Sequence, residues 1–165
     1  MIRILLILTL FVTLALPSTN NASGFVKVAA IRVSFVTDDN PGTTGDGSFL
    51  YSAPIDTCGK YTIDPVPHNR SYFVSQLRAV SNYFSSVSYN NFGIDMDNSM
   101  VFPAAEEDSY VLSNEMNYYH PFNEDEIHNE RITELFRDAV QTAYSVDSIN
   151  FSLYDHIVIF HAGIG

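Results

Sequence analysis

Five histidines are the residues of this 165-residue chain best suited to bind a catalytic metal: His68, His120, His128, His156 and His161. No two of them are four positions apart, so the H-E-x-x-H pattern, which places two imidazoles on one helix face around zinc, is absent. Glu124 is four positions from His128, but acidic residues at a helix start more often stabilise the helix dipole. The sequence therefore predicts no metal ligand and no catalytic residue in this chain, which we expect to be inactive by itself.

Other catalytic or binding chemistry has weaker support. Asp95, Asp97 and Ser99 imitate a calcium-binding loop, but Met100 stands where the sharp turn requires glycine. Calcium binding stays open at three loop aspartates, which more often are solvated turn residues: Asp38, Asp39 and Asp46. The G-x-S-x-G pattern of a serine nucleophile does not occur.

A sheet is expected to position the candidate residues. The C-terminal segment of the chain predicts the most buried strand of that sheet. Residues 157–160 are an unbroken apolar run that polar residues precede and glycines follow. This pattern is typical of a strand buried on both faces, so we expect it inside a sheet with helices above and below. Gly163 and Gly165 also resemble the start of a G-x-G-x-x-G turn, which leaves a truncated dinucleotide-binding domain as a remote alternative.

The preceding segments supply the layers around this strand. A long loop rich in Gly, Pro and Asp is expected at residues 37–68. A polar connection between elements is expected at residues 104–122. The order of the elements predicts an α/β domain with a mixed sheet and two main covering helices. The expected elements are a partly exposed strand at 25–36, a helix at 70–88, a hairpin of two short strands at 94–96 and 100–102, and a helix capped by Asn123 that continues to Tyr144.

Both expected helices carry an apolar stripe at helical spacing, which should lie on the sheet. In the first helix the stripe is Phe73, Leu77, Val80, Phe84 and Val87. In the second helix it is Ile132, Leu135, Phe136, Ala139, Val140 and Ala143.

Charge and the N-terminus indicate an exported protein. The net charge of -11, with only 8 Lys and Arg, argues against a nucleic-acid partner. Residues 1–22 predict a secretory signal, with Arg3 before an apolar run at 4–16 that is too short to span a bilayer. The remaining residues, 23–165, form one domain that is secreted or exported to the cell envelope. Cys58, the single cysteine, cannot form a disulfide within this chain.

Three segments of the chain together resemble the front half of the immune-inhibitor-A type of secreted zinc metallopeptidase. They are VKVAAIRVSFV at 26–36, YFSSVSYNNFGIDMDNSMVFP at 83–103 and INFSLYDHIVIFHAGIG at 149–165. The last is the most specific, since that family places an Asp-Phe-Ser-x-Tyr-Asp segment before an apolar strand that ends in His-Ala-Gly. Asn150 replaces the first acidic residue of that segment, and Asn91 followed by Phe92 replaces a family glycine.

The resemblance implies the N-terminal, non-catalytic scaffold of a zincin-like domain, truncated before the H-E-x-x-H helix, which would lie beyond Gly165. Zinc would then belong to the parent enzyme, where it polarises the scissile carbonyl of a peptide substrate and activates water. The partner implied for this portion is the missing C-terminal half of the same domain. His161, Ala162 and Gly163 are candidates to line the substrate cleft at a strand end. The alternative is a complete exported acidic domain that binds partners without catalysis.

Overall fold

A computed structural model describes residues 24–43, 45–52, 66–121 and 125–163. The predicted signal segment, Cys58 and the expected helix cap at Asn123 lie outside the described residues. Within the described ranges, no helix combines the length and hydropathy needed to cross a membrane.

The structure is organised around strand β2 (Val28–Ser34), whose residues are all buried. Strand β6 (His156–His161) pairs with β2 in parallel from Val28 to Val33 and so takes one whole edge of it. Strands β4 (Met100–Phe102) and β5 (Tyr110–Val111) therefore follow one another along the other edge, both also parallel to β2. A second, two-stranded parallel sheet joins β1 (Gly24–Val26) to β3 (Phe92–Ile94).

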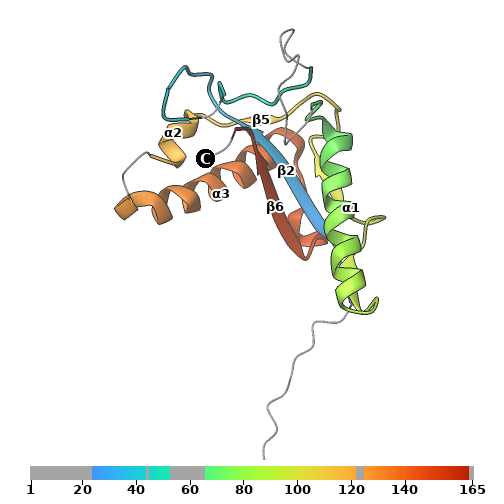
Figure 1. The fold of residues 1–165 in the computed structure, drawn as a ribbon. Coiled ribbons are helices and arrows are strands. Elements are labelled where there is room, and N and C mark those ends of the chain that lie inside the picture. The colour runs from blue at the N-terminus through green and yellow to red at the C-terminus, as the bar shows by residue number, and fades with distance from the viewer. Residues whose placement is uncertain (1–23, 44, 53–65, 122–124, 164–165) are drawn as a thin grey trace, which may run out of the picture.

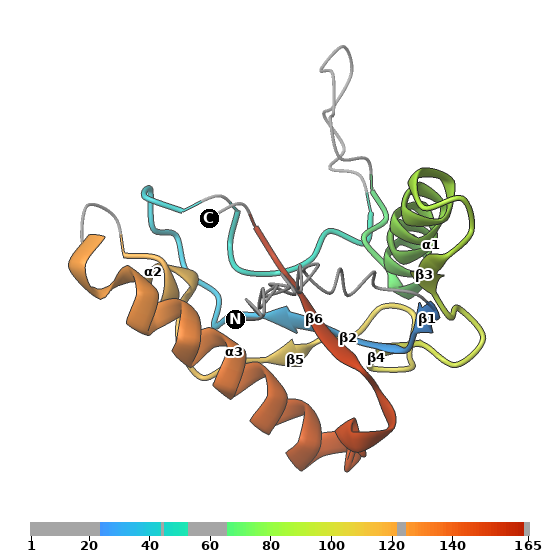
Figure 2. The same cartoon turned by 90° about the horizontal axis from the view of Figure 1, so that it is seen from below.

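Two long helices cover opposite faces of the four-stranded sheet that contains β2: α1 (Arg70–Val87) and α3 (Asp125–Asp147) (Figures 1 and 2). Alternate residues of β2 point to the two faces: Ile31 and Val33 pack in the cluster that includes α3, while Val28 and Ala30 pack in the cluster that includes α1. The short helix α2 (Met116–Tyr119) joins the α3 side, and the 3-10 turn η1 (Phe151–Leu153) leads into β6. The predicted α/β class is confirmed.

Helix α1 begins and ends almost where the sequence predicts. Asn69 caps it by accepting a hydrogen bond from the Tyr72 backbone N–H. The predicted apolar stripe, however, is only half buried: Phe73 and Leu77 lie in the core, whereas Val80, Phe84 and Val87 are exposed. The C-terminal half of α1 contacts the narrow β1–β3 sheet and extends beyond the main sheet, so its apolar residues have less surface to cover them (Figure 1).

The pairing of the strands corrects three expectations. Strands β3 and β4 do not form a hairpin, because each pairs in parallel with a strand of a different sheet. All pairings among the described strands are parallel, where a mixed sheet was expected. Strand β6 is not the interior strand: its only partner among the described strands is β2, and residues 157–160 are half-buried.

The first predicted strand, 25–36, is divided at Lys27 into β1 and β2, and β2 is more buried than expected. Arg32 and Ser34, two polar residues within the strand that was expected to be partly exposed, are 0% and 5% exposed. The Arg32 guanidinium donates to three backbone carbonyls of the segment after β4, at distances of 2.5–2.8 Å: Pro103, Ala105 and Glu106. A polar residue in a strand thus indicates either exposure or a buried network, and alternation alone does not distinguish them.

Candidate functional site: the apolar hollow beside strand β6

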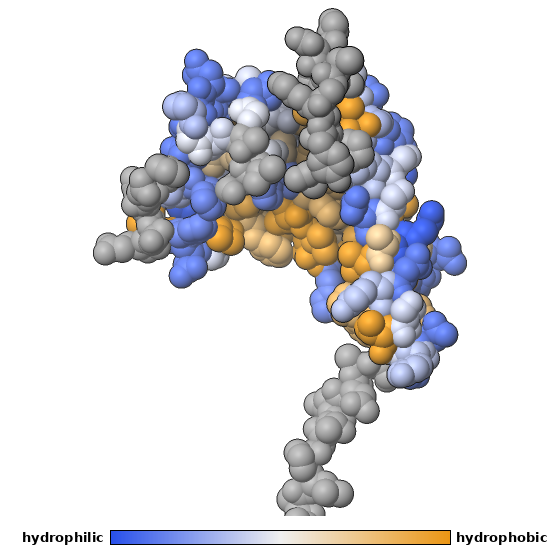
Figure 3. All heavy atoms as spheres, in the orientation of Figure 1, coloured by the Kyte–Doolittle hydropathy of each residue, from blue (hydrophilic) through white to orange (hydrophobic). Residues whose placement is uncertain are grey.

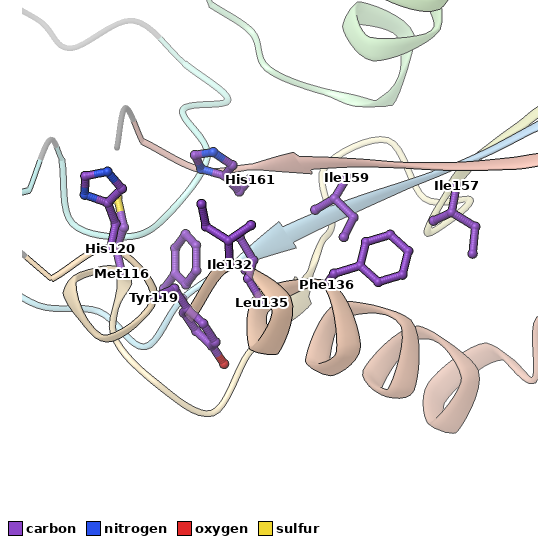
Figure 4. A pocket seen from close by; sticks show the side chains of 10 residues that line it. Met116, Tyr119, His120, Ile132, Leu135, Phe136, Ile157, Ile159 and His161 are labelled. Carbon is purple, nitrogen blue, oxygen red and sulfur yellow. The ribbon is translucent and has the colours of Figure 1, made fainter. Parts of the chain in front are cut away.

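An apolar hollow of about 360 Å³ lies between β6 and α3 and is closed at one end by α2 (Figure 4). Hydrophobic residues gather in the concave surface between the α3 side and the α1 side of the molecule (Figure 3). We call the cavity between β6 and α3 the hollow. Its lining consists of Phe35, Met116, Tyr119, His120, Ile132, Leu135, Phe136, Ile157, Ile159 and His161.

The alternation of β6 and the spacing of α3 explain how the hollow forms. Ile157 and Ile159 are two residues apart and so extend from the same face of β6, toward α3. Ala139 and Ala143 of α3 are fully buried against the sheet, and these small side chains let the helix backbone approach it closely. Toward the N-terminus of α3 the helix carries large side chains instead, and Ile132 and Phe136 remain 49% and 47% exposed. The C-terminal part of the apolar stripe predicted for this helix thus packs against the sheet, and its N-terminal part lines the open hollow.

Helix α2 closes the hollow with side chains from a segment for which the sequence predicts a polar connection. Met116 and Tyr119 are both 2% exposed. The Tyr119 ring lies 5.7 Å from that of Phe35, and its hydroxyl donates to Asp138 at 3.0 Å. Burial raises the pKa of the Tyr119 phenol, so it stays protonated as a donor. The spacing of Met116 and Tyr119, three residues apart, is the sequence signal that could have identified this helix.

Among the residues that the structure describes, the lining of the hollow includes no Asp, Glu, Lys or Arg, although the chain carries 19 acidic and 8 basic residues. Charged groups lie outside the lining. One example is the Arg131–Glu134 ion pair of α3, in which Arg131 Nη1 lies 2.6 Å from Glu134 Oε2. The Arg131 guanidinium also lies 4.0 Å from the centre of the Tyr118 ring. The hollow is therefore an uncharged apolar region of an acidic protein.

Two histidines lie at the α2 end of the hollow, and only one of them was predicted to line a cleft. His161, at the end of β6, is exposed, and its ring lies 6.2 Å from that of Phe35. His120 follows α2, and its ring lies 4.4 Å from that of His128. Ala162 is buried in the cluster on the α1 face and Gly163 is exposed, so neither of them lines the hollow with His161.

The side chains that could bind a metal ion are dispersed over the described part of the chain. Across the described ranges, no three His, Cys, Asp or Glu side chains are close enough to share a metal ion. Asp38 and Asp46 instead accept hydrogen bonds from the backbone N–H groups of Asn40 and Ser48, each two residues further on. These contacts are those of ordinary turn residues.

No protein-family model, curated protein or solved structure matches this chain. The arrangement of its residues defines an α/β scaffold with an apolar hollow and, beside it, a strand that has one partner among the described strands.

Proposed function

We propose that this chain is the non-catalytic scaffold portion of an exported zinc-dependent endopeptidase. The observation that carries the proposal is the exposed apolar hollow beside β6. Soluble proteins seldom leave a large contiguous apolar surface in water, and such a surface usually contacts further polypeptide. A scaffold whose sheet is completed by another part of the same enzyme would have this surface.

The sequence of β6 supports the proposal because it suits an interior strand better than an edge. Its four central residues are Ile, Val, Ile and Phe, yet they are only half-buried, whereas the residues of β2 are at most 5% exposed. The interior position expected for residues 157–160 thus requires a further strand against β6. If no such strand exists in the natural protein, the peptidase proposal loses its main support.

The peptidase class comes from the resemblance of three segments to the immune-inhibitor-A type. Its most specific part, residues 149–165, contains β6, and His161, the last residue of that strand, lies at the end of the hollow. In the proposed enzyme this portion would hold β6 in place and present His161 near the substrate, while residues elsewhere in the polypeptide would cleave the peptide bond. No catalytic step is assigned to the residues of this chain.

The first test is to determine the encoded sequence beyond Gly165. From the resemblance we expect an H-E-x-x-H motif within about a hundred residues, with its two histidines spaced to bind zinc on one helix face. The polypeptide that contains both parts should then hydrolyse a denatured protein substrate, and a chelator should abolish this activity. The 165-residue chain alone should show none. A natural stop codon after Gly165 with a stable exported product would refute the proposal.

The second candidate is an exported acidic domain that binds its partners without catalysis. The uncharged lining of the hollow favours it, because a preformed apolar cavity can bind a ligand without other polypeptide. A soluble monomer that melts cooperatively and keeps the hollow open would support this candidate over the first.

A further inference from the structure

One edge of β6 has no strand partner among the described residues, and hydrogen bonds identify which groups lie along it. The backbone N–H groups of His156 and Ala162 donate to Lys27 and Val33, on the β2 side. Because consecutive residues of a strand direct these groups to opposite edges, the even-numbered residues from 156 to 162 face β2. The N–H and C=O groups of Ile157, Ile159 and His161 therefore face the open edge.

This edge lacks the features by which proteins prevent unwanted strand pairing. Natural edge strands are usually short, or carry Lys, Pro or a bulge. Residues 157–160 contain no charge and no proline, and β6 pairs with β2 in regular register along six residues. Such an edge is typical of a strand with a permanent neighbour.

The side chains on both faces of β6 continue the two cores of the domain. Ile157 and Ile159 pack partly in the cluster on the α3 face, and Val158 and Phe160 pack partly in the cluster on the α1 face. A strand next to β6 would thus place alternate side chains over the hollow and over the α1 face. Apolar side chains would be needed at least over the hollow, whose lining has no charge to pair with.

We propose that the open edge of β6 pairs with a further β-strand of the parent polypeptide, uncharged and apolar at alternate residues, whose apolar row fills the hollow. This inference rests on the proposed function, since it takes the strand from the same enzyme. A helix could fill the hollow but would leave the N–H groups of Ile157 and Ile159 unpaired. A second copy of this chain would bring together two molecules that each have a net charge of -11.

The test uses the 165-residue chain and a synthetic strand as the probe. The probe is a blocked octapeptide in which threonine and valine alternate between two terminal lysines. Amide hydrogen exchange of the chain is measured at single residues with and without the peptide. We expect saturating peptide to slow exchange at Ile157, Ile159 and His161 by about tenfold or more, because ladder hydrogen bonds protect amides from exchange. The amides of Val158 and Phe160, which face β2, should change little.

Matched controls separate strand pairing from general hydrophobic binding. The same peptide with proline at its central valine lacks a ladder donor and should protect none of the three amides. Phe136→Glu places a carboxylate in the hollow and should weaken binding of the original peptide about tenfold or more. Val146→Glu changes a residue of the same helix that is 66% exposed and does not line the hollow, so binding should be unchanged.

Three outcomes would contradict the inference, and a fourth would contradict only the proposed function. Unchanged exchange at the three outward-facing amides, at saturating peptide and with the fold intact, would show that the edge does not accept a strand. Protection that rises with protein concentration in the absence of peptide would identify a second copy as the occupant. Equal protection by the proline peptide would indicate hydrophobic binding without strand pairing. Strand pairing in a protein whose full polypeptide shows no chelator-sensitive proteolysis would remove only the proposed function.

Discussion

The buried Arg32 guanidinium should contribute strongly to stability, and its replacement by methionine measures that contribution. Arg32 lies in the central strand with no exposed surface, and it donates to the carbonyls of Pro103, Ala105 and Glu106 at 2.8, 2.5 and 2.8 Å. These bonds fix the segment that connects β4 to β5. The Glu106 carboxylate in turn accepts from the backbone N–H and hydroxyl of Ser71, at the start of α1.

The expected loss follows from opposing contributions. Hydrogen bonds from a charged donor contribute about 1.5–3 kcal/mol each, so the three bonds supply roughly 5–9 kcal/mol. Burial of the cation costs several kcal/mol, which methionine avoids. Burial also lowers the pKa of Arg32, and its Nε has no hydrogen-bond partner among the described residues. Because the carbonyl of the buried Pro103 would lose its donor, we expect Arg32→Met to lower the free energy of unfolding by about 2–4 kcal/mol.

Urea unfolding at neutral pH, followed by circular dichroism at low protein concentration, measures this loss. Arg32→Lys is the sharper variant, because a buried ammonium keeps the desolvation cost but cannot reach three carbonyls with the geometry of a guanidinium. We expect it to be at least as destabilising as Arg32→Met. Arg78→Met, at an exposed position of α1, is the control and should stay within about 0.5 kcal/mol of the parent. If Arg32→Lys were as stable as the parent chain, the carbonyl geometry would not be the source of the stability.

Three further predictions concern the core, the pH dependence and the hollow. The buried Ser81 hydroxyl bonds both the N–H and the C=O of Ile94, at 2.9 and 3.0 Å, so Ser81→Ala should cost about 1–3 kcal/mol in urea unfolding. Ser75→Ala, at an exposed position, should cost less than about 0.5 kcal/mol, and equal losses would contradict the assignment. Burial of Tyr110 raises the pKa of its phenol above the unfolded value near 10, and the Asp147 carboxylate, which accepts a hydrogen bond from that phenol, raises it further. This stabilisation is complete below about pH 10 and is lost as the pH rises toward the folded-state pKa, so unfolding free energies that stay constant from neutral pH to beyond pH 10 would contradict it. Finally, the isolated chain should bind a hydrophobic dye, and Phe136→Glu should reduce this binding more than Val146→Glu does. A monomer that binds no dye would show that the hollow is not accessible.

Local patterns in the sequence were enough to locate most of the elements. The 3.6-residue stripe gave α1, with ends within a residue of those observed, and the capping signals placed the start of the second helix close to that of α3. The apolar run at 157–160 lies within β6. These features depend on residues a few positions apart, so a single sequence contains them. The candidate site was predicted less well: of His161, Ala162 and Gly163, only His161 lines the hollow.

The sequence by itself therefore determined the two long helices and most of the strands, the α/β class and the acidic character of the chain, but not β5 and α2, which lie in the predicted polar connection. The tertiary structure alone decided that β2 is the central strand, that β3 and β4 belong to different sheets, and that Arg32 is buried under a set of carbonyls. It also decided that the stripe of α3 ends in an open hollow. The physical reason is that strand order and burial are set by contacts between residues far apart in the chain, such as the hydrogen bond from the Lys27 backbone N–H to the Asp155 carboxylate, 128 positions away. An apolar run shows that a strand can be buried on both faces, but only its neighbours decide whether it is.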